Sequence, residues 1–112
     1  MEQFFNIQMI VPLGRRIGTL SLKKSGEQDI YGTLNLFGYE TPFNGKLMPD
    51  GEIAFSGQMI TLTRTFPYQA QGRIDGTKIK LEVVGDNSRF IITGEEDDLC
   101  NEKDYLPSDS FL

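Results

Sequence analysis

The feature that most constrains this chain is a series of short segments, between about residues 3 and 95, in which apolar and polar residues alternate. Such alternation is typical of antiparallel strands that bury one face and expose the other. Gly, Pro, Asn and Asp interrupt it at short intervals, and nothing indicates a long helix. The sequence therefore predicts an all-β fold with eight strands, at residues 3–12, 17–24, 29–37, 39–47, 52–60, 65–74, 77–84 and 88–95.

The links between these segments are short. Residues 25–27, 48–51 and 75–76 are strong hairpin signals, because glycine supplies the positive φ that tight turns require. Six strands place a glycine on the apolar phase, which suits a strongly coiled or closed sheet. We therefore predict an eight-stranded antiparallel up-and-down barrel, which also removes exposed strand edges. The alternative, a two-sheet sandwich, needs longer crossover links than this sequence has. The six glycines are Gly18, Gly32, Gly45, Gly57, Gly72 and Gly94.

The strand phase predicts an inner face of roughly twenty large apolar side chains. An eight-stranded barrel is just wide enough to be filled by such side chains or to hold one small ligand. Two interiors therefore stay open: a packed core, or a cavity for an apolar or aromatic molecule. In the second case the hydroxyls of Tyr39, Thr41 and Tyr68 are the expected polar contacts. In the first case they are core side chains with satisfied hydroxyls.

The charge of the chain is unevenly distributed along its 112 residues. Residues 95–112 carry seven acids and one base, whereas residues 1–94 carry nine acids and ten bases. We expect one barrel domain over residues 1–95 and an acidic, solvated, flexible tail over 96–112. The alternative is a tail that docks on a basic surface, either its own or a partner's.

The missing residue types exclude several kinds of chemistry. The chain has no histidine, no tryptophan and a single cysteine, Cys100. Ser-His-Asp and Cys-His catalysis, the usual zinc sites and a disulfide framework all need residues that are absent. Glu40 and Glu52 are strand carboxylates beside apolar residues, but both fall on the polar phase. We therefore expect a protein that is not an enzyme and uses no cofactor or metal; a barrel enzyme that works without histidine is the alternative.

The ends and the charge balance also predict the compartment and exclude some partners. Residues 1–6 lack the pattern of a signal peptide, and no apolar run approaches the length of a membrane span. These features predict a cytoplasmic protein that does not bind membranes. The body is neutral and has no basic stripe interleaved with aromatics, and the acidic tail repels phosphate, so we expect no nucleic-acid partner.

Repeated glycine-ended hairpins, of which residues 53–57 are an example, resemble the calycin type of barrel, the lipocalins and fatty-acid-binding proteins. The likeness is greatest to small uncharacterised bacterial relatives, and it spans residues 3–95. The Gly-x-Trp of lipocalins is absent, and residues 12–16 replace the two helices that fatty-acid-binding proteins have after the first strand. No ligand residue is carried over, so any function that this resemblance implies is an analogy from fold.

Alternate loops of a meander share one end of the barrel, and the two ends differ in composition. Residues 25–28, 48–51 and 75–76 give one end tight, acidic turns, whereas residues 13–16, 37–38, 61–65 and 85–88 gather at the other. The second end brings four arginines together with Leu13, Phe37 and Leu62. Guanidinium groups suit carboxylates and phosphates because the planar fork donates two hydrogen bonds.

We therefore predict that the arginine-rich end binds a small anionic, partly apolar ligand or an acidic segment. Three alternatives stay open: scattered surface arginines beside loops that fold over the barrel mouth, a protein-interaction or assembly module that uses this end or the tail, and a homo-oligomer. The candidate binding residues are Arg15, Arg16, Phe37, Tyr39, Arg64, Tyr68 and Arg89.

Overall fold

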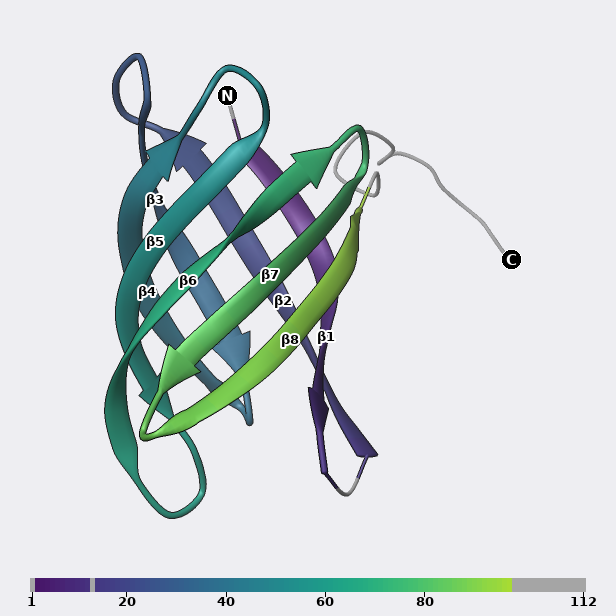
Figure 1. Cartoon of the computed structure of the whole chain (residues 1–112), viewed down its shortest axis with the longest axis vertical. Helices are drawn as coiled ribbons and strands as arrows, with labels where there is room; N and C mark the ends of the chain where they lie inside the picture. Colours follow the sequence, from purple (N-terminus) through teal and green to yellow (C-terminus); the bar gives the residue numbers. More distant parts are fainter. Residues whose placement is uncertain (1, 13, 98–112) are drawn as a thin grey trace, which may run out of the picture.

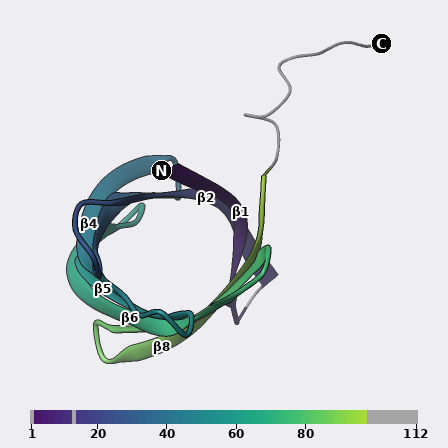
Figure 2. The same ribbon diagram turned by 90° about the horizontal axis from the view of Figure 1, so that it is seen from above.

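A computed structural model describes residues 2–12 and 14–97 of the chain. Each strand pairs antiparallel with the next one in sequence, and β1 pairs with β8 to close the barrel (Figures 1 and 2). The predicted up-and-down barrel is thereby confirmed, and the sandwich alternative is wrong. The strands are β1 (Glu2–Val11), β2 (Gly14–Lys24), β3 (Asp29–Leu36), β4 (Tyr39–Leu47), β5 (Glu52–Ile60), β6 (Thr65–Asp75), β7 (Lys78–Gly85) and β8 (Ser88–Glu96).

The main difference from the predicted strands lies at the start of β2. The link predicted at residues 12–16 is shorter, because β2 begins at Gly14 and pairs back onto β1 from Val11 onward. The ladder between β2 and β3 ends at Thr19 and Asn35. The β1–β2 hairpin therefore projects beyond the barrel, at the bottom of Figure 1.

Apolar side chains from all eight strands form one buried cluster inside the barrel, as the strand phase predicts. Alternation predicts the face of a side chain but not its depth along the barrel axis. Tyr39 shows the difference: it has the inward phase, yet it begins β4 at the barrel rim and is 42% exposed. The buried cluster contains Phe5, Ile7, Met9, Leu20, Leu22, Ile30, Leu34, Leu36, Phe43, Ile53, Phe55, Met59, Phe66, Tyr68, Ala70, Ile79, Leu81, Val83 and Ile92.

The six inward glycines lie where neighbouring backbones approach closely. A Cβ atom at any of them would lie 1.9–2.7 Å from a carbonyl oxygen of an adjacent strand. Any side chain there would push two strands apart, so these positions permit the coiling that closes the sheet. The prediction that they mark close backbone approach is confirmed.

The two ends of the barrel are built differently. We call the end with the β2–β3, β4–β5 and β6–β7 connections the laced end, because backbone hydrogen bonds join each connection to a neighbouring strand. The opposite end, with the projecting β1–β2 and β5–β6 hairpins and two tight turns, is the open end (Figure 1). The lacing bonds run from Leu47 N to Gln28 O, from Ile74 N to Gly51 O and from Glu96 N to Thr77 O, at 2.8, 2.8 and 2.6 Å.

The last strand ends one residue later than predicted. Glu96 belongs to β8, and the backbone nitrogen of Asp97 donates to Phe4 O at 2.7 Å. Most of the predicted acidic tail, together with Cys100, lies outside the described residues. Within the described ranges, no helix is long and apolar enough to cross a membrane.

Candidate functional site

An aromatic cluster lies inside the barrel where β4, β5 and β6 adjoin. The rings of Phe43 and Phe55 stack with their centroids 4.1 Å apart, and Tyr68 meets Phe55 edge-on at 6.1 Å. Gly57 stands opposite Phe43 on one side and Tyr68 on the other. Because Gly57 has no side chain, the Tyr68 hydroxyl comes within 3.1 Å of where its Cβ would be. The register of three strands thus directs a hydroxyl into an aromatic interior.

The Tyr68 hydroxyl is buried without a hydrogen bond. Tyr68 is 3% exposed, and over the described residues its oxygen is the only buried side-chain polar atom that lacks a partner within the protein. Burial raises the pKa of Tyr68 well above its ordinary value, so the folded protein keeps this proton at pH values where an ordinary tyrosine loses it. Leaving such a group unpaired costs about 1–3 kcal/mol. The nearby Thr41 is also buried, but its Oγ1 donates to Leu34 O at 3.4 Å.

The barrel wall is split between β4 and β5 beside this hydroxyl. Their ladder runs from Leu47 and Ile53 to Phe43 and Gly57 and stops there, while β5 continues to pair with β6 as far as Ile60. Residues 39–42 of β4 therefore have no partner on β5. A shallow surface hollow of about 960 Å³ lies over the split. Most of its lining has the outward phase, for example Glu40, Gln58 and Gln69, and Thr41, Phe43, Gly57 and Tyr68 also belong to it. Strand alternation does not signal such a split, so the sequence did not predict it.

Proline occupies the unpaired edge of β4. Pro42 has no N–H that could donate to an additional strand at this edge. Its carbonyl oxygen lies 2.7 Å from the Cβ position of Gly57. The edge is thereby protected from pairing with another chain. A proline within a predicted strand is the sequence signal for such an edge, and Pro67, which precedes the first β6–β7 pair, is a second example.

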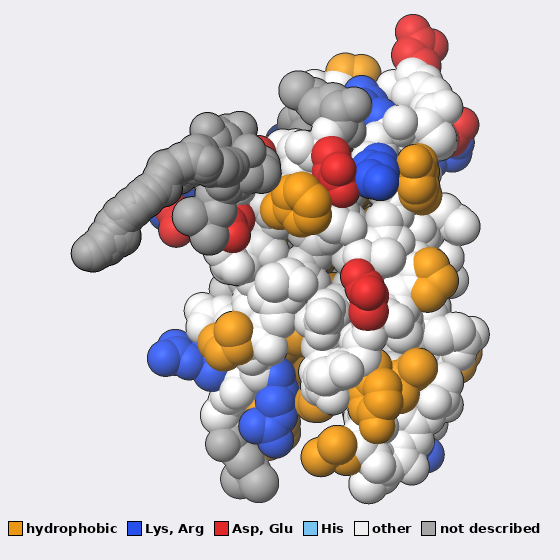
Figure 3. Space-filling view, turned by 180° about the vertical axis from the view of Figure 1, so that it is seen from behind, with side chains coloured by type: hydrophobic (Ala, Val, Ile, Leu, Met, Phe, Trp, Pro, Cys, Tyr) orange, Lys and Arg blue, Asp and Glu red, His pale blue; other side chains and the backbone are white. Residues whose placement is uncertain are grey.

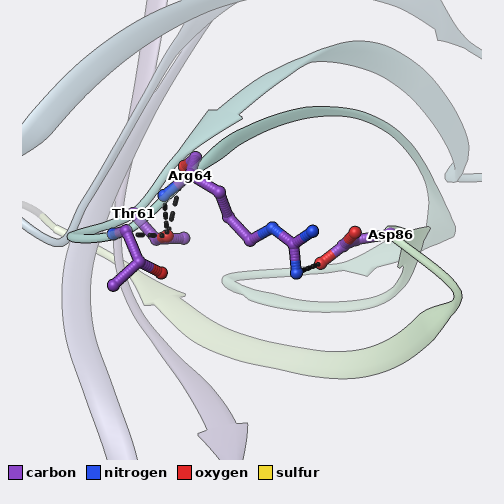
Figure 4. Close-up of polar contacts among 4 residues, drawn as sticks. Thr61, Arg64 and Asp86 are labelled. Atoms are coloured by element: carbon purple, nitrogen blue, oxygen red, sulfur yellow. Dashed lines mark hydrogen bonds and ion pairs between the residues drawn. The ribbon is translucent and has the colours of Figure 1, made fainter.

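The structure places the four predicted arginines at the open end but gives them different partners. Arg64 Nη1 lies 2.9 Å from Asp86 Oδ2, and Arg89 Nε lies 3.0 Å from Glu82 Oε2. Figure 4 shows Arg64 reaching from the β5–β6 loop to the β7–β8 turn, while Thr61 holds the loop backbone. The charges of Arg64 and Arg89 are therefore balanced by carboxylates.

Arg15 and Arg16 have no ion pair within the described part of the chain. Arg16 follows the inward phase of Leu20 and Leu22, and its guanidinium carbon lies 6.0 Å from the centroid of the Phe37 ring. Arg15 has the outward phase, and both arginines are exposed. Only Arg16 thus combines an uncommitted charge with a position facing the barrel mouth.

Phe37 has an unusual backbone conformation. It is half-buried against the core, and φ is 57° at Phe37 and 80° at Gly38, as in the tight turns favoured by β-hairpins. A bulky residue at positive φ is rare. Figure 3 shows the side of the barrel opposite to that in Figure 1; toward the open end on this side, apolar and basic side chains lie next to one another.

Among the described residues, no three Asp, Glu, Cys or His side chains gather in a way that would hold a metal ion. The polar groups that the site offers are therefore the Tyr68 hydroxyl inside the barrel, and the Arg16 guanidinium and Tyr39 hydroxyl at its rim. The structure does not bring Arg64 and Arg89 into this set.

Comparison with known proteins identifies a fold. No protein-family model matches the sequence, and no curated protein matches it. Among solved structures the chain is similar to a redesigned β-barrel, mFAP1, solved bound to DFHBI, with a TM-score of 0.60 and 15% sequence identity. The similarity covers 82% of this chain and 91% of the designed one. It shows a small eight-stranded antiparallel barrel, while the resemblance to lipocalins and fatty-acid-binding proteins stays a prediction.

Proposed function

We propose that this chain is a non-enzymatic barrel that binds a small molecule. The apolar or aromatic part of that molecule would contact the aromatic cluster inside the barrel. The observation that carries the proposal is the buried, unpaired hydroxyl of Tyr68 within the Phe43–Phe55–Tyr68 cluster. A ligand that accepts a hydrogen bond from this hydroxyl would recover the free energy that the unpaired group costs. Its rings would continue the edge and face contacts that the three aromatic side chains already make.

Two further observations support this proposal. Ligand sites are mostly apolar hollows of about 300–1,000 Å³ with a few polar groups that set orientation. The hollow over the β4–β5 split has a volume of about 960 Å³, and Tyr68 is one of its lining residues. The similar designed barrel is described as bound to DFHBI, a small molecule.

The placement of the carboxylates supports a binding role over catalysis. Glu40 and Glu52 are exposed on the outer face of the barrel. In the described interior, Thr41 is the one buried residue of polar type, and its hydroxyl is bonded to a backbone carbonyl. The interior thus offers hydroxyl groups that orient a ligand but no carboxylate for general acid or base catalysis.

Native mass spectrometry of gently purified full-length protein tests this proposal. We expect an adduct that leaves on denaturation and whose occupancy falls at least tenfold in Tyr68→Phe. Tyr31→Phe is the matched control, because Tyr31 is 45% exposed on the outer face of β3. A wild-type protein that carries no adduct and takes up no aromatic probe would overturn the proposal.

A second candidate function is self-assembly through the projecting hairpin. Ile17 is 70% exposed and Ile10 is 47% exposed, both on the outer face, and β2 has no β3 partner before Thr19. An unpaired strand edge beside exposed isoleucines favours pairing of two β2 edges in a symmetric dimer. Light scattering should then show a dimer that Ile17→Lys converts to a monomer; a wild-type monomer at high concentration contradicts this function.

A further inference from the structure

Phe37 occupies a turn position that disfavours its side chain. Both central residues of its two-residue turn have positive φ, at 57° and 80°. Asn, Asp and Gly tolerate such positions, and the other tight turn at this end has Asp86 and Asn87 there, with φ of 54° and 57°. Nothing in the turn geometry requires an aromatic ring. Backbone strain of this kind concentrates at functional sites, so the ring is the feature to explain.

Arg16 supplies the second part of this site. Its guanidinium lies over the Phe37 ring at 6.0 Å from the centroid, near the outer limit of a cation–π contact. Unlike Arg64 and Arg89, it has no carboxylate partner among the described residues. A guanidinium held against a ring keeps its N–H groups free to donate two parallel hydrogen bonds to a carboxylate, sulfonate or phosphate.

The separation from Tyr68 sets the size of the ligand. The Pro42 carbonyl oxygen and the Tyr68 hydroxyl lie 2.7 and 3.1 Å from the Cβ position of Gly57, and Gly38 follows Phe37 in the turn at the rim. Pro42 lies four positions after Gly38, which is about 13 Å along the strand at a rise of about 3.3 Å per residue. Two or three linked rings with a charged substituent span this distance. Between the two points lie the inward-phase residues Tyr39 and Thr41.

We infer that the ligand is a planar organic anion whose charged group binds Arg16 over Phe37 while its rings extend toward Tyr68. This inference rests on the proposed function, since it names the ligand class of the same barrel site. Arg16 and Phe37 determine the preference for an anion, and the aromatic cluster binds the rings.

Two fluorescent probes that differ in charge test the inference. Anilinonaphthalene sulfonate carries one sulfonate, and N-phenyl-1-naphthylamine has the same rings without it. We expect the wild-type protein to bind the sulfonate at least tenfold more tightly than the neutral probe. Arg16→Gln should bring this ratio to within twofold of one and leave the affinity for the neutral probe unchanged.

Lys24→Gln is the control for net charge. Lys24 lies on the same strand and in the same phase as Arg16, but at the laced end. It should leave the affinity for both probes within twofold of wild type. An equal loss of sulfonate binding in Lys24→Gln and Arg16→Gln would show nonspecific attraction and overturn the inference.

Phe37→Asn separates recognition from stability. Asn suits a positive φ, so the unfolding midpoint should stay or rise, while sulfonate binding falls at least fivefold. A variant that keeps full sulfonate affinity overturns the role of Phe37. If the wild-type protein binds both probes equally, the anion inference fails and the proposed function stands; if it binds neither, both fail.

Discussion

The laced end and the open end close the same barrel by different means. At the laced end, backbone groups of one connection bond to the next strand, as Ile74 N does to Gly51 O at 2.8 Å. At the open end, the connection between loops depends on side chains, chiefly the pair formed by Arg64 and Asp86 at 2.9 Å. Backbone bonds hold whatever the side chains are, whereas side-chain contacts depend on residue identity.

The difference separates stability from recognition. Unpaired strand residues occur at the open end, at the start of β2 and over residues 39–42 of β4, and the strained Phe37 lies there too. Local regions with few backbone hydrogen bonds open at lower free energy than the rest of a fold. If the proposed function holds, we expect a ligand to enter at the open end, while the backbone hydrogen bonds of the laced end stay in place.

The largest expected effect compares one glycine from each end. Gly51 has φ of 98°, and a Cβ there would lie 2.5 Å from Ile74 O; Gly38 has φ of 80° and open space around it. Gly51→Ala adds a backbone clash to the strain of positive φ, so we expect a loss of about 3 kcal/mol. Gly38→Ala should lose about 1 kcal/mol from strain alone. Urea unfolding followed by circular dichroism measures both, and equal losses would contradict the distinction between the ends.

Removing the Tyr68 hydroxyl should stabilise the ligand-free barrel. Tyr68→Phe keeps the ring against Phe55 and removes an unpaired buried group, so the free energy of unfolding should rise by about 1 kcal/mol. A loss of stability in this variant would show that the hydroxyl is satisfied in solution. Thermal unfolding of protein shown by mass spectrometry to carry no adduct is the measurement.

The same residue predicts how stability depends on pH. The unfolded chain releases the Tyr68 proton near its ordinary pKa of 10.0, whereas burial raises the pKa in the folded state. The unfolded state therefore binds fewer protons above pH 10, and stability falls by about 1.4 kcal/mol per pH unit until the folded state also titrates. Tyr68→Phe lacks this contribution, so the difference between the two stability curves from pH 9 to 11 isolates it. Parallel curves would mean that Tyr68 ionises as easily in the fold as outside it.

The sequence predicted the barrel because period-two alternation and inward glycines can be read from a few consecutive residues. Alternation indicates a strand with one buried face, and an inward glycine indicates a closely approaching neighbouring strand. Gly57 and Gly72 marked close approaches that the structure has. The site was harder to predict because it depends on where ladders stop. Arg64 pairs with a carboxylate in another connection and Arg89 with one on the neighbouring strand, and only the three-dimensional arrangement shows these pairs. The exposure of Tyr39 likewise depends on its position along the barrel axis, and the alternation of apolar and polar residues does not predict that position.

Exchanging residues between the two tight turns of the open end should show how much the strain at Phe37 lowers the free energy of unfolding. Phe37→Asn relieves a bulky side chain at positive φ and should raise the free energy of unfolding by about 0.5–1 kcal/mol. Asn87→Phe places the same strain in the β7–β8 turn and should lower it by about 1 kcal/mol. Chemical denaturation of both variants checks the pair. If Phe37→Asn is destabilising, packing of the ring on the core outweighs the strain, and stability alone explains Phe37.

The smallest expected effect compares the surface ion pairs of the two ends. Arg64–Asp86 joins two connections at the open end, and the Asp86 side chain is 26% exposed; Lys46–Asp29 at the laced end has side chains 58% and 59% exposed. Double-mutant cycles should give a coupling of about 0.5–1 kcal/mol for the first pair and less for the second, both weakening in high salt. Backbone bonds already join Gln28 to Leu47 beside the second pair, so its loss leaves the connection in place. A larger coupling for Lys46–Asp29 would mean that side chains hold the laced end as well, and the contrast between the ends would then rest on the unpaired strand residues alone.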